Sequence, residues 1–159
     1  MLQPAPLQSV YNRYQPNAQV GMLADMVAFA GDSRIIETAA GIGFGLAVSQ
    51  GVNDDGCIIG GSAPVGVTCA DATLPQAAGI TTVDKYSQYD NAGILVMGDI
   101  WVYAYASVTP ATAVVFEAAT GKFGIAGTTY PNARWMMTVV GSAGTPVLAV
   151  LRLANISSK

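Results

Sequence analysis

The chain contains no histidine and few charged side chains. Without histidine it lacks the commonest general base and the commonest zinc ligand, and Ser-His and Cys-His catalytic pairs are excluded. Charged residues make up 11% of the sequence, whereas a soluble domain usually carries about 25%. Because 52% of the residues are hydrophobic and the mean hydropathy is +0.42, either small polar residues cover the surface or another protein does.

Basic residues are scarce and scattered. The chain has seven Lys and Arg residues, a net charge of −3 and a pI near 4.5. Because neutralising phosphates requires clustered basic side chains, we expect no direct contact with nucleic acid. The best apolar segment, residues 38–48, is too short for the roughly 20 residues of a membrane span, so no membrane partner is expected. The N-terminus lacks the basic start and apolar block of a signal peptide, which favours a chain made and used in a cytoplasm.

Two cysteines allow at most one internal disulfide. Cys57 and Cys69 are 12 residues apart, a spacing that excludes a CxxC redox or zinc motif. In a cytoplasmic protein two such residues are usually small buried thiols. Free thiols are therefore the favoured interpretation, and a disulfide is the alternative.

No motif in the chain carries catalytic or cofactor chemistry. Residues 41–45 read Gly-Ile-Gly-Phe-Gly, which lacks the spacing of a dinucleotide loop and the Lys-Ser/Thr of a P-loop. Residues 53–56 read Asn-Asp-Asp-Gly but lack the remaining ligands of a calcium loop. The other candidate acids are isolated in sequence: Asp71, Asp84, Asp90 and Asp99. We predict no enzymatic activity, no cofactor and no metal site.

Alternation of large and small side chains predicts a succession of β-strands. The pattern covers residues 42–48, 65–69, 100–105, 112–116, 135–139 and 147–151. The last segment is apolar on both faces and predicts a strand buried on both sides. Gly and Asn clusters between the runs predict turns, and only residues 25–30 and 74–78 suggest single helical turns. We therefore expect an all-β fold, an antiparallel sandwich or a jelly-roll-like barrel with little helix.

The first 20 residues differ from the remainder and predict an extended N-terminal arm followed by a single β domain, residues 21–159. The arm contains three prolines and shows no sustained period. A frayed terminus is one interpretation. In the other, the arm docks on a neighbour through Tyr11, Arg13 and Tyr14, because Tyr and Arg are enriched at the centres of protein interfaces.

One predicted strand places three aromatic residues on a single face. Trp101, Tyr103 and Tyr105 alternate with small aliphatic residues. They either fill the core or form a contact surface with a partner, and the sequence leaves both possibilities open.

An ordered series of short segments resembles a known family. It comprises residues 21–25, Arg34, Glu37, residues 42–48, Gly51, residues 86–90, 98–102, 121–123, 133–135 and 147–151. In this order and spacing, over about residues 7 to 153, the series resembles the structural cement (capsid decoration) proteins of tailed bacteriophages. The region from Cys57 to Cys69 is not matched.

The resemblance implies an all-β, often jelly-roll-like protein without enzymatic activity. It implies binding to the outside of the icosahedral shell of the virion, across joints between major capsid protein subunits, after synthesis in the host cytoplasm. The expected partners are the major capsid protein and further copies of the chain, as a homodimer or homotrimer. The alternatives are a phage tail or baseplate component, or a small β-sandwich carbohydrate-binding module.

Overall fold

The computed structural model describes residues 18–26, 28–71, 73–74 and 85–154, and these residues form ten β-strands and no helix. The predicted helical turn at residues 25–30 is wrong, since Ala30 begins the first strand and the residues before it form no turn of helix. The turn predicted at 74–78 lies almost wholly outside the described residues. The strands are β1 (Ala30–Ile36), β2 (Ile42–Gly43), β3 (Ala47–Gln50), β4 (Gly56–Ile59), β5 (Pro64–Thr68), β6 (Lys85–Tyr86), β7 (Asn91–Ala104), β8 (Ala113–Phe116), β9 (Thr128–Trp135) and β10 (Val147–Leu153).

Five strands close into a small barrel. Backbone pairing runs β1–β4–β3–β5–β7 and returns from β7 to β1. All of these pairings are antiparallel except β1–β4, which is parallel. Because the ring closes, its interior is lined by alternate residues of each strand.

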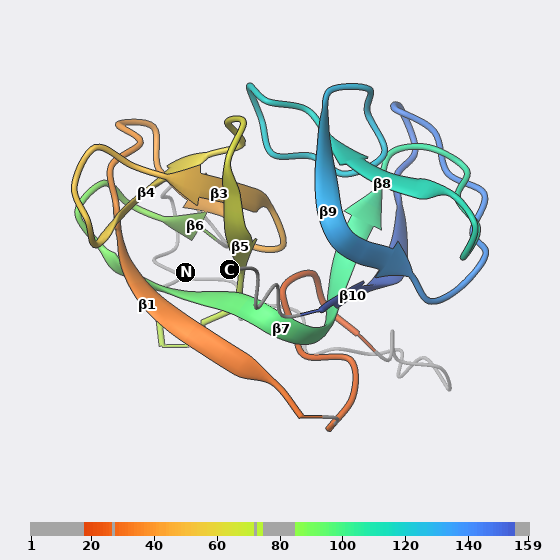
Figure 1. The fold of residues 1–159 in the computed structure, drawn as a ribbon, viewed down its shortest axis with the longest axis horizontal. Helices are drawn as coiled ribbons and strands as arrows, with labels where there is room; N and C mark the ends of the chain where they lie inside the picture. Colours follow the sequence, from red (N-terminus) through yellow and green to blue (C-terminus); the bar gives the residue numbers. More distant parts are fainter. Residues whose placement is uncertain (1–17, 27, 72, 75–84, 155–159) are drawn as a thin grey trace, which may run out of the picture.

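The second half of the chain continues the sheet into another lobe. From β7 the order is β10–β9–β8, and Phe123 forms single bridges to both Ala104 at the end of β7 and Phe116 at the end of β8. The 14-residue β7 therefore belongs to both lobes: it runs along the lower edge of the left lobe and then turns upward into the right one (Figure 1). Gly98, with a φ of +127°, lies where β7 passes from one lobe to the other, a conformation that glycine adopts without steric cost.

Each lobe has its own apolar core. The first barrel encloses seven buried residues: Ile36, Ile42, Val48, Cys57, Tyr86, Ala92 and Ile94. The second core is larger and centres on four aromatic side chains, Phe116, Phe123, Tyr130 and Trp135, which meet mostly edge to face. Such contacts add to the free energy gained by removing apolar area from water. The all-β, barrel-like, jelly-roll-compatible fold predicted from alternation is confirmed.

Three of the predicted strands differ in detail. The strand predicted at residues 135–139 is wrong, because β9 ends at Trp135 and beyond it only Val139 forms an isolated bridge, to Val108. Residues 42–48 form β2 and β3 with a turn between them, because Gly45 takes a φ of +66°, yet Ile42 and Val48 still enter the same core and Phe44 and Leu46 pack against it. Residues 147–151 do lie in a central strand, but the prediction that both faces are buried is wrong. In β10 only Ala149, Leu151 and Leu153 are buried, and the intervening side chains are half-exposed.

Candidate interaction surface

The three aromatic residues predicted on one strand face lie on the outside of β7. Ile100, Val102 and Ala104 point into the core, and because side chains alternate along a strand, Trp101, Tyr103 and Tyr105 point away from it. Tyr103 is 38% exposed, and the other two are half-buried. These residues do not fill the core, so the structure brings Trp101, Tyr103 and Tyr105 together on an outer surface, called here the aromatic stripe.

Strand β10 extends this outer face with apolar side chains. In the antiparallel register, Val150 lies opposite Trp101 and Leu148 lies opposite Tyr103. Both β10 residues are half-exposed. Opposite residues of an antiparallel pair share a face of the sheet, so the outside of β7 and β10 is apolar for two successive cross-strand pairs. This apolar outer face accounts for the two-sided apolar pattern of residues 147–151.

The segment that follows the predicted arm is bound to the same strand. The Gly21 N–H donates to the Trp101 carbonyl (2.7 Å), and the Trp101 N–H donates to the Met22 carbonyl (2.9 Å). The Ala24 N–H donates to the backbone carbonyl of Asp99 (2.8 Å). We call residues 18–24 the arm root. The predicted anchors Tyr11, Arg13 and Tyr14 lie outside the described residues, but the arm that carries them joins the domain beside the aromatic stripe.

A cleft of about 210 Å³ opens between the arm root and the aromatic stripe. In this cleft Val20 faces Tyr103 and Tyr105, whose ring centroids are 6.5 Å apart at an interplanar angle of 68°. The Lys122 Nζ lies 5.0 Å from the centre of the Tyr105 ring, a cation–π contact. Burial raises the pKa of Tyr105, so its phenol remains a hydrogen-bond donor. The remaining lining residues are Gly43, Phe44, Gly45 and Leu46.

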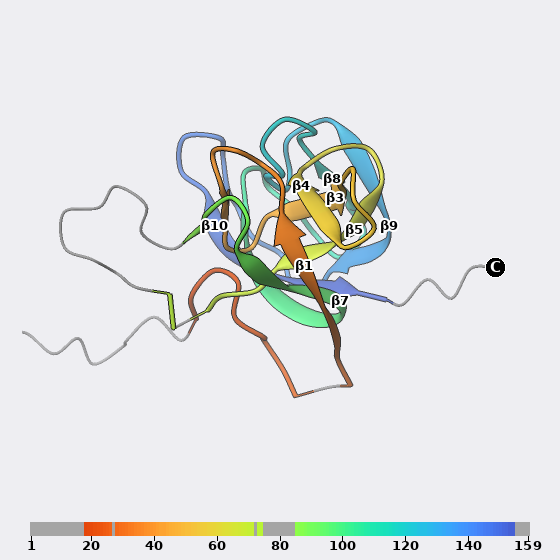
Figure 2. The ribbon, with the colours of Figure 1, turned by 90° about the vertical axis from the view of Figure 1, so that its left-hand side faces the viewer.

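Exposed apolar side chains gather from the second half of the arm root to the start of β1. Among the described residues ten large hydrophobic side chains are exposed, and four of them are Met22, Leu23, Met26 (93% exposed) and Phe29 (56% exposed). This apolar projection extends from the body of the molecule at its lower edge (Figure 2). Sequence reasoning missed it, because Met22–Phe29 has no period of two and was interpreted partly as a helical turn. The sequence feature that could have revealed this projection is the concentration of Met, Leu and Phe residues directly after Gly21.

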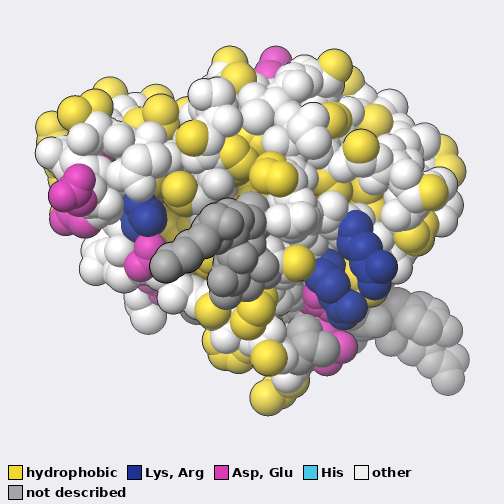
Figure 3. Space-filling model, viewed as in Figure 1, with side chains coloured by type: hydrophobic (Ala, Val, Ile, Leu, Met, Phe, Trp, Pro, Cys, Tyr) yellow, Lys and Arg dark blue, Asp and Glu magenta, His cyan; other side chains and the backbone are white. Residues whose placement is uncertain are grey.

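Charges on the face shown in Figure 3 gather mainly in two small groups, and yellow and white atoms cover most of the rest. The Arg152 guanidinium donates from Nε and Nη2 to the two carboxylate oxygens of Asp99, both at 2.7 Å. Asp99 is 4% exposed. The hydrogen bonds and charge of Asp99 raise the pKa of Arg152. Asp99, an isolated acid in the sequence, is thus a structural ion-pair partner.

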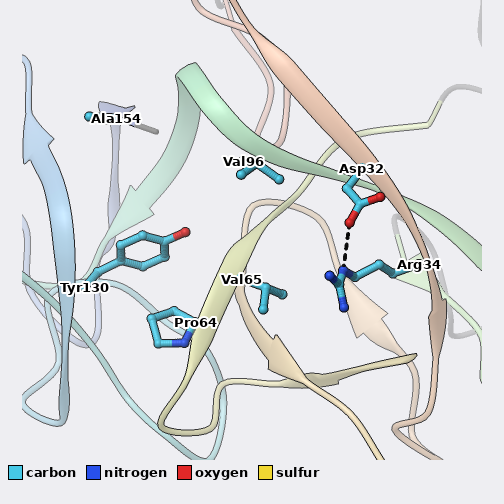
Figure 4. Close-up of a pocket in the computed structure, with 7 residues that line it drawn as sticks. All are labelled: Asp32, Arg34, Pro64, Val65, Val96, Tyr130 and Ala154. Atoms are coloured by element: carbon cyan, nitrogen blue, oxygen red, sulfur yellow. Dashed lines mark hydrogen bonds and ion pairs between the residues drawn. The ribbon is translucent and has the colours of Figure 1, made fainter. Parts of the chain in front are cut away.

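A second cleft, of about 270 Å³, lies between the two lobes. Tyr130 and Pro64 lie on one side of it and the Asp32–Arg34 pair on the other, with Val65 and Val96 between them (Figure 4). Arg34 Nε donates to Asp32 (3.0 Å) and Nη1 donates to Gln50 Oε1 (2.6 Å). Asp32 and Arg34 therefore pair with each other, and Arg34 also forms hydrogen bonds at the β3–β4 turn.

The β3–β4 turn, which the sequence offered as half of a calcium loop, is held by the Glu37 carboxylate together with Gln50, whose Nε2 donates to the Asn53 carbonyl (2.7 Å). Glu37 accepts hydrogen bonds from the N–H groups of Val52 (2.7 Å) and Asn53 (2.9 Å) and from the Asn53 side chain (2.7 Å). These bonds, led by that of the Asn53 N–H, lower the pKa of Glu37. In the part of the chain that is described, no group of three or more Cys, Asp or Glu side chains could hold a metal ion.

Both cysteines are free thiols. Burial raises the pKa of Cys57 to about 11 and also raises that of Cys69. Because thiolates are the reactive form, neither residue has the character of a nucleophile.

No helix within the described ranges is long and apolar enough to cross a membrane.

Comparison with known proteins identifies the family. No curated protein sequence gives a significant match. One solved structure, "The capsid of Myoviridae Phage XM1", contains a chain that superposes with a TM-score of 0.61 at 15% identity, over 98% of each chain; at this identity the likeness supports the fold. The model of the structural cement protein family (E217 gp24/Pam3 gp6) matches residues 7–154. Because that match spans nearly the whole sequence, the chain belongs to the structural cement protein family and has the role of a phage capsid cement, or decoration, protein.

Proposed function

We propose that this protein binds the outer surface of the icosahedral shell, at joints between major capsid protein subunits, after synthesis in the host cytoplasm. The contact surface comprises the apolar projection, the aromatic stripe and the N-terminal arm with Tyr11, Arg13 and Tyr14. The protein acts as a homo-oligomer, makes no direct contact with the packaged nucleic acid and catalyses no reaction.

The observation that carries this proposal is the position of the apolar projection. Met26 and Phe29 are among the most exposed large side chains of the described residues, and they follow directly on the arm root. Contiguous exposed apolar side chains mark interaction sites rather than ordinary surface. In a protein with 11% charged residues, few Lys and Glu side chains need to be desolvated when such a surface is covered.

Cement function follows from mass action. A protein that binds the assembled lattice, and not separate subunits, stabilises the lattice in proportion to its affinity and concentration. If each oligomer contacts several capsid subunits, modest individual contacts combine through effective concentration. An extended arm would add contact area without a larger core, and fixing its side chains on binding would cost conformational entropy.

Titration of the full chain onto expanded capsids tests the proposal. Met26→Ser is compared with Val52→Ser, because both side chains are 93% exposed but Val52 lies in the β3–β4 turn, away from the arm root. We expect Met26→Ser to weaken capsid binding by about tenfold, the effect of losing an apolar interface anchor of about 1.4 kcal/mol. Val52→Ser should bind as the parent protein does.

Two results would contradict the proposal. The first is equal loss of binding in both variants, which would place the contact elsewhere. The second is quantitative mass spectrometry of purified virions that finds the protein at only a few copies per particle, as expected of a tail or baseplate component. A carbohydrate-binding module is disfavoured by the tyrosines of the stripe, whose 68° interplanar angle forms no flat platform for a sugar ring.

A further inference from the structure

The cleft beside the arm root has the chemistry of a site for an extended, proline-containing segment. Its walls are the rings of Phe44, Tyr103 and Tyr105 with the aliphatic side chains of Val20 and Leu46. Grooves lined by aromatic residues bind polyproline II segments, because proline rings pack on aromatic rings and the extended backbone presents carbonyls to phenol donors. Tyr103 and Tyr105 supply both the rings and the phenols.

Tyr103 and Tyr105 both line this cleft, so a ligand in the cleft lies beside them. Within the described ranges no hydrogen bond engages the hydroxyl of Tyr103 or Tyr105. Lys122 covers the face of the Tyr105 ring, whereas Tyr103 is 38% exposed and forms the open wall. A segment entering the cleft therefore meets Tyr103 first and can accept hydrogen bonds from two phenols and an ammonium group.

The chain itself contains a matching segment. Pro4-Ala5-Pro6-Leu7 is the only place in the sequence with two prolines within three residues. Proline fixes φ near the polyproline II value, so this segment loses little conformational entropy on binding. It carries no charge, which suits a cleft whose only charged side chain already rests on an aromatic ring.

The length of the arm favours a cleft on another copy. Leu7 is 13 residues before Val20, and a chain of that length spans about 40 Å when extended. A domain of this size has a radius of gyration of only about 14 Å. The first glycine of the chain is Gly21, so the residue type that reverses a backbone most freely is absent from the arm.

We propose that Pro4–Leu7 of one copy occupies the cleft formed by Phe44, Tyr103 and Tyr105 of a neighbouring copy. The arm leaves each copy beside the cleft that its neighbour's arm fills. Two copies can therefore exchange arms reciprocally in a two-fold dimer, or each arm can pass to the next copy in a closed ring. The inference deepens the proposed homo-oligomer but does not depend on capsid binding.

Crosslinking of full-length chains tests the exchange without capsids. In a Cys57→Ala, Cys69→Ala background, a Leu7→Cys chain is mixed with a Lys122→Cys chain and treated with a short bismaleimide. The expected product joins the two different variants. A mixture of Leu7→Cys with Val52→Cys, a fully accessible site away from the cleft, measures random collision. Adding Tyr103→Ala to the Lys122→Cys chain should lower the specific yield about tenfold, as loss of one interface anchor implies.

Three outcomes would overturn the inference. A yield no higher than that of the Val52→Cys mixture would show that the arm does not enter the cleft. A chain carrying both Leu7→Cys and Lys122→Cys that links only within itself would place the arm in its own cleft. Crosslinking of Lys122→Cys solely to the major capsid protein, when expanded capsids are added, would make the capsid the occupant. Titration of the same variants onto capsids shows separately whether capsid binding, the proposed function, is retained when the arm exchange is absent.

Discussion

Replacing Gly21 by alanine tests whether the arm root is fixed in place by the fold. Gly21 has a φ of +83°, and a left-handed conformation costs a residue with a Cβ about 1–2 kcal/mol. The added Cβ would lie 2.8 Å from the Ala70 nitrogen and 2.9 Å from the Phe44 Cβ. Because the first of these atoms is backbone, no side-chain rotation relieves the contact.

Relief requires the arm root to move away from β7. That movement breaks the hydrogen bond from Gly21 to Trp101 and the one from Ala70 to Gly21 (both near the ideal length, at 2.7 and 2.8 Å), each worth about 1 kcal/mol. The expected destabilisation is about 2–4 kcal/mol, and for a chain of this size it lowers Tm by roughly 5–15 °C. The two cores remain intact, so the variant still folds.

Thermal unfolding followed by circular dichroism measures the fall in Tm, and co-sedimentation with expanded capsids measures the loss of capsid binding. We expect the displaced root to misdirect the arm and weaken capsid binding. Gly144→Ala is the matched control, since no atom lies within 4 Å of its added Cβ, and its Tm should change little. If Gly21→Ala matched Gly144→Ala in both assays, the reasoning that the root is held by close backbone packing would be refuted.

Three further predictions follow from the same structure. Deleting residues 1–14 should preserve the fold but weaken capsid binding; a deletion variant with no cooperative melt would show that the arm belongs to the core. Arg152→Met should lower Tm more than Asp99→Asn, because it leaves the buried carboxylate of Asp99 unpaired, whereas Arg152 is half-exposed and reaches water; differential scanning calorimetry ranks the two. The hydrogen bond from Asn53 lowers the pKa of Glu37 below its ordinary 4.5, so the stability it confers is complete above pH 4.5 and is lost as the pH falls through the folded-state pKa. Glu37→Gln should therefore flatten the acid limb of a Tm-against-pH curve, and an unchanged limb would refute this assignment.

The strands that alternate most regularly could be predicted, because period-two patterning reflects one buried and one exposed face. Residues 100–105 are the clearest case, with Ile100, Val102 and Ala104 inside and the aromatic stripe outside. The sequence could not tell which face was the core, since both sets are apolar. That distinction depends on the pairing of β7 with β10, which is a long-range property.

Three features of the structure escaped prediction for physical reasons. Strand β1 is exposed at five of its seven positions, so it lacks the apolar alternation that identifies a half-buried strand. The break at Gly45 was hidden because a glycine with positive φ looks the same in sequence as a small residue on the second face of a strand. The placement of the arm root against Trp101 rests on backbone hydrogen bonds, which leave no trace in side-chain pattern.

Strand β7 is hydrogen-bonded in both lobes, and this gives the protein its mechanical character. A pull on the arm root acts on backbone bonds around Trp101, in the part of β7 that pairs with β10, whereas β1 and β5 hold the other end of the same strand. Such a load divides between the two lobes and must shear several ladders together, instead of peeling one open bond by bond. A molecule tethered to a shell under internal pressure would then yield at its contacts before it unravels.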